Sequence, residues 1–157
     1  MKTLYLIDGY AQFFRAFHAI RTPMTSPVTK EPTNATYGFV GMILKLMREC
    51  SPDYIAVAID VSSDRGTFRS DIFPEYKANR SEIPDTLPVQ IDRCIALLRA
   101  LNIPVIGTER FEADDVIATI STNLKRDHKD VAIKIVSKDK DLAQLIEPGR
   151  RSCRRRL

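Results

Sequence analysis

Residues 4–8, Leu4-Tyr5-Leu6-Ile7-Asp8, decide the fold, because four apolar residues lead directly into an aspartate. Such runs occur four times and lead to these acidic residues: Asp8; Asp60 after Tyr54–Ile59; Glu112, Asp114 and Asp115 after Ile103–Ile106; and Asp139 and Asp141 after Val131–Val136. Continuous apolar runs of this length are typical of parallel strands buried on both faces. Ligands of an open α/β sheet bind beyond the carboxyl ends of its strands. The sequence therefore predicts an α/β fold with seven carboxylates along one edge of a parallel sheet.

These carboxylates predict a metal site. Like charges within ~4–6 Å raise each other's pKa values, so such a cluster needs a counter-charge. Oxygen ligands of this kind favour Mg²⁺ or Mn²⁺. Any single aspartate is more often a turn residue or a helix N-cap, and Asp114 and Asp115 could simply favour a helix N-terminus. Acidic groups after every predicted strand are hard to explain as separate caps, so the joint pattern favours a metal site.

Helical patterns alternate with the strands, which predicts a parallel sheet with right-handed crossovers. The expected helices are Tyr10–Ile20, a segment from Thr33 or Asn34 to Arg48, Pro88–Leu101, Ala113–Arg126 and a start at Leu142–Ile146. Their expected inward faces are Tyr37, Val40, Leu44 and Met47; Ile91, Ile95, Leu98 and Leu101; and Val116, Ile117, Ile120 and Leu124. Gly38 and Gly41 lie inside a helix, which indicates either a close backbone approach or plain helix packing.

Length and composition indicate one domain of 157 residues without repeats. No apolar run approaches the ~18 residues of a membrane span, and the first residues enter a strand directly, so we expect neither a membrane segment nor a signal peptide. Cys50, Cys94 and Cys153 are scattered, which favours a reducing cytoplasm over a disulfide framework or a zinc site. A glycine-rich phosphate loop is absent, and neither His18 nor His128 is visibly paired with a nucleophile.

The net charge of +4 comes from the C-terminus, where five of the last eight residues are arginine. Without those five, 19 basic residues face 20 acidic ones, so residues 1–149 carry a net charge of −1. Bulk charge therefore gives no support for nucleic-acid binding, which has to rest on where the charges lie. Residues 148–157 show no hydrophobic pattern and are expected to form a disordered, arginine-rich tail after a domain of residues 1–147.

Residues 61–87 form a long connection without a convincing strand, and connections this long are usually functional or disordered. This one carries Arg65, Phe68, Arg69, Phe73, Tyr76, Lys77 and Arg80. Cations neutralise phosphates and aromatic rings stack on bases, so the mixture predicts contact with a nucleic acid. A solvated charged loop with its aromatic rings in the core is the alternative. Arg15, two helical turns after Asp8, could reach a phosphate near the metals or simply be a surface arginine.

Five short motifs then stand out: Leu6-Ile7-Asp8-Gly9, Phe68-Arg69, Glu75-Tyr76-Lys77-Ala78-Asn79-Arg80, Glu112-Ala113-Asp114-Asp115-Val116-Ile117 and Ser137-Lys138-Asp139-Lys140-Asp141-Leu142. Together they closely resemble the bacterial 5′-nuclease family, over residues 3–147 and in the family's order. This family is the 5′→3′ exonuclease and flap-endonuclease domain that forms the N-terminal part of bacterial DNA polymerase I. The resemblance implies a PIN-like (resolvase-like) α/β fold with a helical arch, here at about residues 61–87.

The resemblance also implies a chemistry, in which two Mg²⁺ ions, replaceable by Mn²⁺, hydrolyse a DNA phosphodiester near a 5′ end or flap. By position, the first ion would lie among Asp8, Asp60, Glu112, Asp114, Asp115 and Asp139, and the second near Asp139 and Asp141. Lys77 and Arg80 would contact the reacting phosphate, Arg15 would lie near it, and Arg65, Phe68, Arg69 and Tyr76 would bind DNA. Such a domain would serve primer and flap removal in replication and repair. We expect a monomer with a polymerase region encoded downstream.

The family pattern continues with a Gly-Asp-x-x-Asp-Asn segment that completes the second metal site, and then with a helix-hairpin-helix element. Neither is found in this sequence, so we expect a truncated domain with weak or absent turnover and retained binding of the first metal. A catalytically impaired fragment that binds DNA without cutting it is the main alternative. A PIN-type ribonuclease and a doubly wound receiver or small-molecule domain are the others, but neither explains the Tyr76–Arg80 motif.

Overall fold

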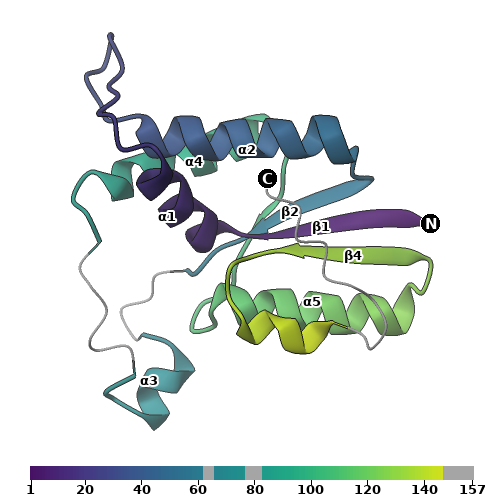
Figure 1. Ribbon diagram of the computed structural model, residues 1–157. Helices are drawn as coiled ribbons and strands as arrows, with labels where there is room; N and C mark the ends of the chain where they lie inside the picture. The colour runs from purple at the N-terminus through teal and green to yellow at the C-terminus, as the bar shows by residue number, and fades with distance from the viewer. Residues whose placement is uncertain (62–65, 77–82, 147–157) are drawn as a thin grey trace.

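A four-stranded parallel sheet forms the centre of the computed structural model, which describes residues 1–61, 66–76 and 83–146 (Figure 1). The strands are β1 (Lys2–Asp8), β2 (Tyr54–Ala58), β3 (Val105–Ile106) and β4 (Val131–Val136). Their order across the sheet is β3-β2-β1-β4, and every pair is parallel. The predicted α/β fold with a parallel sheet is confirmed, although β3 is shorter than its apolar run suggested.

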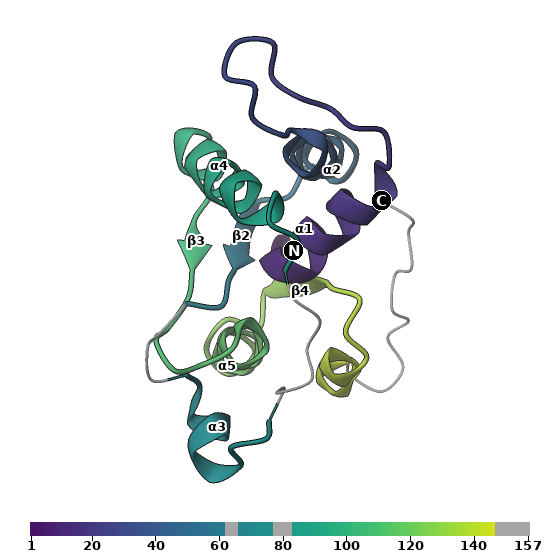
Figure 2. The ribbon, with the colours of Figure 1, turned by 90° about the vertical axis from the view of Figure 1, so that its left-hand side faces the viewer.

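Helices cover both faces of the sheet. Helices α1 (Gly9–Ala19), α2 (Asn34–Cys50) and α4 (Leu87–Ala100) lie on one face, and α5 (Ala113–Asp127) lies on the other with the 3₁₀ helix η1 (Asp141–Leu145) beside it (Figures 1 and 2). The short helix α3 (Phe68–Ile72) stands away from both layers. None of the helices in the described part of the chain is long and apolar enough to cross a membrane.

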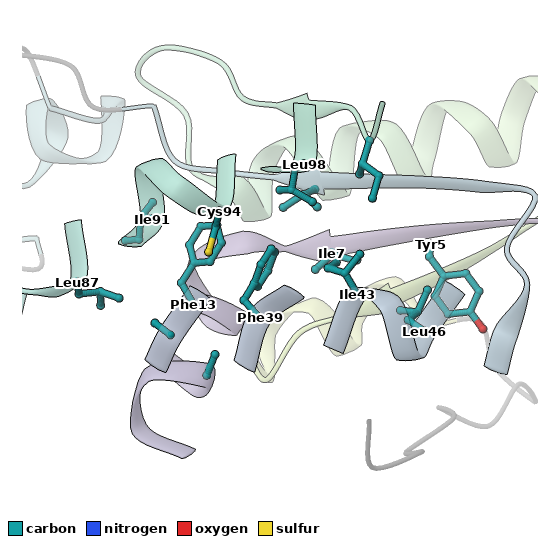
Figure 3. Close-up of a cluster of buried hydrophobic side chains, with 14 residues drawn as sticks. Tyr5, Ile7, Phe13, Phe39, Ile43, Leu46, Leu87, Ile91, Cys94 and Leu98 are labelled. Atoms are coloured by element: carbon teal, nitrogen blue, oxygen red, sulfur yellow. The ribbon is translucent and has the colours of Figure 1, made fainter. Parts of the chain in front are cut away.

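Strand β1 is buried on both sides, which explains its unbroken apolar sequence. Tyr5 and Ile7 point into a cluster with Phe13, Phe39, Ile43 and Leu46 beneath α1, α2 and α4 (Figure 3). Leu4 and Leu6 point the other way, toward Ala113 and Ile117 of α5. Ile7 is fully buried, and Asp8, the next residue, ends the strand at the edge where the acidic residues gather.

The predicted inward face of α2 is wrong except at Val40, which is partly buried against the core. Tyr37, Leu44 and Met47 are 66%, 51% and 39% exposed, whereas the buried residues of the helix are Ala35, Phe39, Ile43 and Leu46. Apolar residues occur on several sides of this helix, so periodicity alone admitted two stripes. Contact with α1 selects between them, because a Cβ atom at Gly38 would lie 3.1 Å from the Cβ of Ala16. Gly38 thus serves close helix packing, while Gly41 faces open space.

Two further expectations need correction. Leu101, expected on the inner face of a helix, follows the end of α4 and is 43% exposed. The expected helix at Leu142–Ile146 is the 3₁₀ helix η1 instead, and only Leu142 in it is buried. The inner faces of α4 and α5 otherwise follow the prediction, with Ile91, Leu98 and Ile117 buried. In the region 61–87, the described residues contain α3 and turns, so the helical arch stays a prediction.

A buried glutamine joins the three helices of the first layer. Gln90 in α4 is 1% exposed, and its Oε1 accepts hydrogen bonds from the backbone N–H groups of Ala35 (2.8 Å) and Thr36 (3.3 Å). Its Nε2 donates to Asn34 Oδ1, and Asn34 Nδ2 donates to carbonyls at the end of α1. Thr33, the N-cap residue of α2, makes no capping hydrogen bond with its side chain. Gln90 of α4 accepts from the first turn of α2 in its place.

Candidate active site

Asp8 starts the acidic edge and also begins α1. It is 6% exposed, and its Oδ1 accepts a hydrogen bond from the backbone N–H of Ala11 at 3.1 Å, as an N-cap residue does. Its Oδ2 accepts a hydrogen bond from Ser137 Oγ at 2.7 Å, which links the ends of β1 and β4. Gly9 follows because a Cβ there would lie 2.9 Å from the carbonyl oxygen of Ala58 in β2. The Asp-Gly pair therefore turns the chain into α1 against the sheet.

The loop after β4 extends this edge. Ser137 Oγ bonds the backbone N–H of Asp139 at 3.0 Å, and Asp139 Oδ1 accepts from the backbone N–H of Asp141 at 2.9 Å. Asp139 and Asp141 are both exposed, unlike Asp8. Ser137 thus joins the buried carboxylate of Asp8 to the backbone of the loop that carries Asp139 and Asp141. Sequence reasoning assigned it no role, although its position directly after β4 was the available signal.

Asp60 and Glu112 lie where β2 and the loop after β3 approach α5. Asp60 Oδ1 accepts a hydrogen bond from the backbone N–H of Ala113, the first residue of α5, at 2.6 Å. Glu112 is 7% exposed and precedes that residue, and its Oε2 lies 3.4 Å from the hydroxyl of Tyr76. The amino end of α5 therefore points at the acidic edge, where its partial positive charge favours anions.

The pKa of Asp114 responds to its burial and to the other carboxylates of the acidic edge. Burial, followed by the charges of Asp8, Asp139, Asp60 and Glu112, raises the pKa of Asp114 to about 6. The pKa of Asp8 is also raised, first by burial and then by Asp60 and Asp139. Within the described residues Asp114 has no hydrogen bond or ion pair that would offset this repulsion. Carboxylates from four separate segments therefore lie close enough to affect the pKa of Asp114, and their role as metal ligands stays a prediction.

Asp115 differs from its neighbour because it is paired. Arg69 of α3 donates to both of its oxygens, from Nη1 to Oδ2 at 2.6 Å and from Nη2 to Oδ1 at 2.7 Å. Asp115 Oδ2 also accepts from the backbone N–H of Glu112 at 3.0 Å, across the first turn of α5. Hydrogen bonding to Asp115 raises the pKa of Arg69 further above its usual range. The predicted DNA-binding Arg69 is thus joined to a predicted metal ligand.

Helix α3 is fixed to the same loop by further contacts. The backbone N–H of Phe68 donates to the carbonyl of Arg110 at 3.0 Å, and the rings of Phe68 and Phe111 lie 5.3 Å apart. Arg110 also forms an ion pair with Asp71. Arg110 has a φ of 68°, a left-handed conformation that is unusual for a residue other than glycine. Sequence reasoning missed Arg110, for which the sequence carried no signal.

The other predicted phosphate-contacting residues are placed less completely. Lys77, Arg80 and Arg65 lie outside the described residues. Arg15 lies on α1, where its Nη1 donates to Gln12 Oε1 at 3.3 Å, and both line a cavity of about 150 Å³ between α1 and α2. Its role near a phosphate stays a prediction.

The donor set fits a hard divalent cation in its chemistry, because it consists of carboxylate oxygens, and burial followed by the neighbouring carboxylates raises the pKa of Asp114. Among residues 1–61, 66–76 and 83–146, however, no three acidic, histidine or cysteine side chains lie close enough together to hold one ion. The carboxylates lie at one edge of the sheet, but those in the described residues are too far apart to form a coordination shell. One of them, Asp115, is held by Arg69 instead.

The chain is similar to known proteins in sequence and in fold. The DNA polymerase I of Mycobacterium bovis is 43% identical to the chain over 144 residues, which are 92% of this chain and 16% of that protein. A bacteriophage T5 protein co-crystallised with metal ions matches with a TM-score of 0.65 at 23% identity, over 93% of this chain and 52% of that one. A T5 flap endonuclease in complex with DNA and metal ions matches with a TM-score of 0.60 at 21% identity, over 93% and 52%. At such identities the two structures show the fold alone.

The chain spans about 16% of the length of the polymerase that it matches, so the comparison concerns one domain of a longer relative. Residues 3–155 match the family described as the 5′-3′ exonuclease, N-terminal resolvase-like domain. The parallel sheet, the acidic edge and this match over nearly the whole sequence lead to one conclusion: the chain belongs to the family of 5′-3′ exonuclease N-terminal, resolvase-like domains.

Proposed function

We propose that this chain is the 5′-nuclease domain of a DNA polymerase I-type protein and hydrolyses DNA phosphodiesters near a 5′ end or flap. The observation that carries the proposal is the edge of carboxylates at the carboxyl ends of the parallel strands, where Asp8 and Glu112 are buried, in a chain of this family. Repelling carboxylates at the strand ends are the ligands that a catalytic divalent cation requires. Such an activity would serve primer and flap removal in replication and repair.

The proposed ligands of the first metal ion are Asp8, Asp60, Glu112, Asp114, Asp115 and Asp139, with Asp139 and Asp141 toward a second. Mg²⁺ suits this all-oxygen set, and Mn²⁺ could replace it. When bound, such ions lower the pKa of a water molecule and stabilise the leaving oxygen. Asp8 and Asp139 are held by Ser137, and Asp60 is held by the amino end of α5, so the chain fixes their positions in advance.

The cationic residues would act on the phosphate. Lys77 and Arg80 are proposed to offset the charge that develops on the reacting phosphate, and Arg15 to bind a phosphate near it. Arg65, Phe68, Arg69 and Tyr76 are the proposed DNA contacts. The proposed partners are DNA with a 5′ end or flap and a polymerase region of the same protein, in a cytoplasmic monomer.

A second candidate is a module that binds DNA without cutting it. One observation favours it: among residues 1–61, 66–76 and 83–146, no three ligating side chains are close enough together to hold an ion. Its signature would be DNA affinity that falls steeply with salt and does not depend on a divalent cation.

The deciding experiment is cleavage of a 5′-labelled flap DNA with and without Mg²⁺ or Mn²⁺, with Asp114→Ala as the control. Release of short 5′ products that requires the metal and Asp114 would support the nuclease. Folded protein that binds the flap but releases no product would support the binding module. Preference for a 5′-tailed RNA over the DNA flap would instead indicate a ribonuclease.

A further inference from the structure

Arg69 is the side chain that pairs helix α3 with the acidic edge among the described residues. The Arg69 guanidinium bonds both carboxylate oxygens of Asp115, a two-point geometry that arginine forms better than lysine. The side chains are 30% and 23% exposed, so water screens this pair less than a surface pair. The guanidinium also lies 3.9 Å from Glu112 Oε2. Arg69 is therefore a positive charge set among the acidic residues of α5.

Asp115 has little capacity left for a further ligand while Arg69 is in place. Its Oδ1 accepts from Nη2 of Arg69, and its Oδ2 accepts from Nη1 of Arg69 and from the N–H of Glu112. Asp114, the preceding residue, carries no such partner among the described residues and has a raised pKa. The same turn of α5 thus holds one neutralised and one unneutralised carboxylate.

The remaining contacts of α3 do not reach the acidic residues proposed as ligands. Arg110 pairs with Asp71, and Phe68 packs on Phe111, so these contacts hold α3 on the loop before α5. Arg69 alone joins α3 to a carboxylate of the edge by an ion pair between described residues. A change in the charge balance at Asp115 would therefore be transmitted to α3 through Arg69.

We propose that Arg69 is a built-in counter-ion that competes with a divalent cation for Asp115, so that cation binding releases α3 from the acidic edge. This inference rests on the proposed function, since it concerns the same carboxylates. Linkage makes the effect reciprocal: whatever holds Arg69 on Asp115 weakens cation binding, and a bound cation weakens the hold on α3 by the same factor. Residues 68–76, which lead to the predicted phosphate contacts, would then respond to metal occupancy.

The test is the affinity for Mn²⁺, measured from the electron paramagnetic resonance signal of the free ion at fixed salt. Arg69→Gln removes the counter-charge and should tighten Mn²⁺ binding about fivefold to tenfold, within the usual range of such couplings. Arg69→Lys keeps the charge but loses the two-point bond, so we expect tightening of about twofold. An unchanged or weakened affinity in either variant would overturn the proposal, and the lysine variant decides if the glutamine variant does not fold.

Two matched controls separate the counter-charge from other effects. Arg110→Gln breaks the ion pair between Arg110 and Asp71 of α3 but keeps Arg69 and Asp115 unaltered. Arg126→Gln removes an equal charge from the far end of α5, where Arg126 pairs with Asp127. Both should bind Mn²⁺ within about twofold of the parent, since neither touches the carboxylates of the edge. Tightening in either control as large as that of Arg69→Gln would refute a specific role for Arg69.

Asp114→Ala separates this inference from the proposed function. If Asp114→Ala binds Mn²⁺ as tightly as the parent, the acidic edge holds no metal and the proposed function fails. If Asp114→Ala weakens binding while Arg69→Gln leaves it unchanged, only the counter-ion proposal fails.

A second readout follows α3 directly. The chain has no tryptophan, and Ile72 of α3 is 78% exposed, so Ile72→Trp introduces a single reporter at little structural cost. Saturating Mg²⁺ should lower the fluorescence anisotropy of this tryptophan, and should leave it unchanged when Arg69→Gln is also present. Equal anisotropy with and without Mg²⁺ in the otherwise unaltered chain would overturn the release of α3.

Discussion

Two regions of the molecule meet at neighbouring residues of β1: the apolar layer beneath α1, α2 and α4, and the acidic edge at the strand ends. They affect the stability of the fold in opposite directions. Ile7 is fully buried among side chains of its own kind, and Phe13, Phe39 and Leu46 pack around it. Asp8, one residue later, is nearly as buried, and its pKa is raised by that burial and, to a smaller extent, by Asp60 and Asp139. The first region stabilises the fold, whereas the burial of carboxylates in the second opposes folding, and the proposed function assigns a cation to offset it. Residues that stabilise the fold, such as Ile7, are therefore followed directly by residues proposed for the chemistry, such as Asp8, at the end of β1.

The largest expected effect is in the apolar layer. Phe39 is fully buried, and its ring lies 4.6 Å from that of Phe13, so Phe39→Ala should leave a cavity that the layer cannot close. We expect the free energy of unfolding to fall by about 3–5 kcal/mol, measured by urea denaturation. A loss below about 1 kcal/mol would show that the layer is loosely packed and would remove the contrast with the acidic edge.

The next effect concerns the polar link within the apolar layer. Gln90→Ala would leave the N–H groups of Ala35 and Thr36 without their acceptor at a buried helix end. The expected loss of unfolding free energy is about 2 kcal/mol, the usual cost of unpaired buried polar groups. Gln144→Ala is the matched control, because Gln144 is exposed on η1 and should change stability by less than about 0.5 kcal/mol. Equal losses in the two variants would contradict the capping role of Gln90.

At the acidic edge, a substitution should raise the free energy of unfolding instead of lowering it. The pKa of Asp114 is raised from 3.8 to about 6 in the folded protein, so its ionised form disfavours folding. The penalty is absent below pH 3.8, grows as the pH rises toward about 6 and is complete above it. Asp114→Asn should therefore stabilise the metal-free protein at pH 7 by about 1 kcal/mol, a value discounted because solvent screens a partly exposed carboxylate.

Denaturation in EDTA between pH 4 and pH 7 would check this prediction. The stability difference between Asp114→Asn and the parent should grow over that range, and excess Mn²⁺ should reduce or reverse it by stabilising the parent. A difference that does not vary with pH would mean that the carboxylates at this edge do not repel one another as strongly as their positions imply.

The smallest effect tests the face of α2. Leu44→Ala should change the unfolding free energy by no more than about 0.5 kcal/mol, because Leu44 is 51% exposed. Ile43→Ala, at the adjacent buried position, should cost about 2–4 kcal/mol. A larger loss for Leu44 than for Ile43 would restore the face that periodicity suggested and would move the apolar layer to the other side of the helix.

The sequence by itself determined the parallel sheet and its acidic edge. An unbroken apolar run such as residues 4–7 can be buried on both faces only in a covered sheet, and an aspartate after it must lie at the carboxyl end. Motifs such as Leu6-Ile7-Asp8-Gly9 added the family. These features are local, because each depends on a few consecutive residues whose chemistry permits one arrangement.

Only the tertiary structure decided how these elements face one another. Apolar residues occur on several sides of α2, so the sequence did not determine which side faces the core. The close packing of Gly38 against Ala16 of α1 determines it. Arg69 and Asp115 are 46 residues apart, and neither carries a sequence signal for the other. Their pairing depends on how α3 docks on the loop before α5, through Arg110 and Phe111. The physical reason is that strand burial follows from composition, whereas long-range ion pairs and helix rotation follow from packing that no short segment encodes.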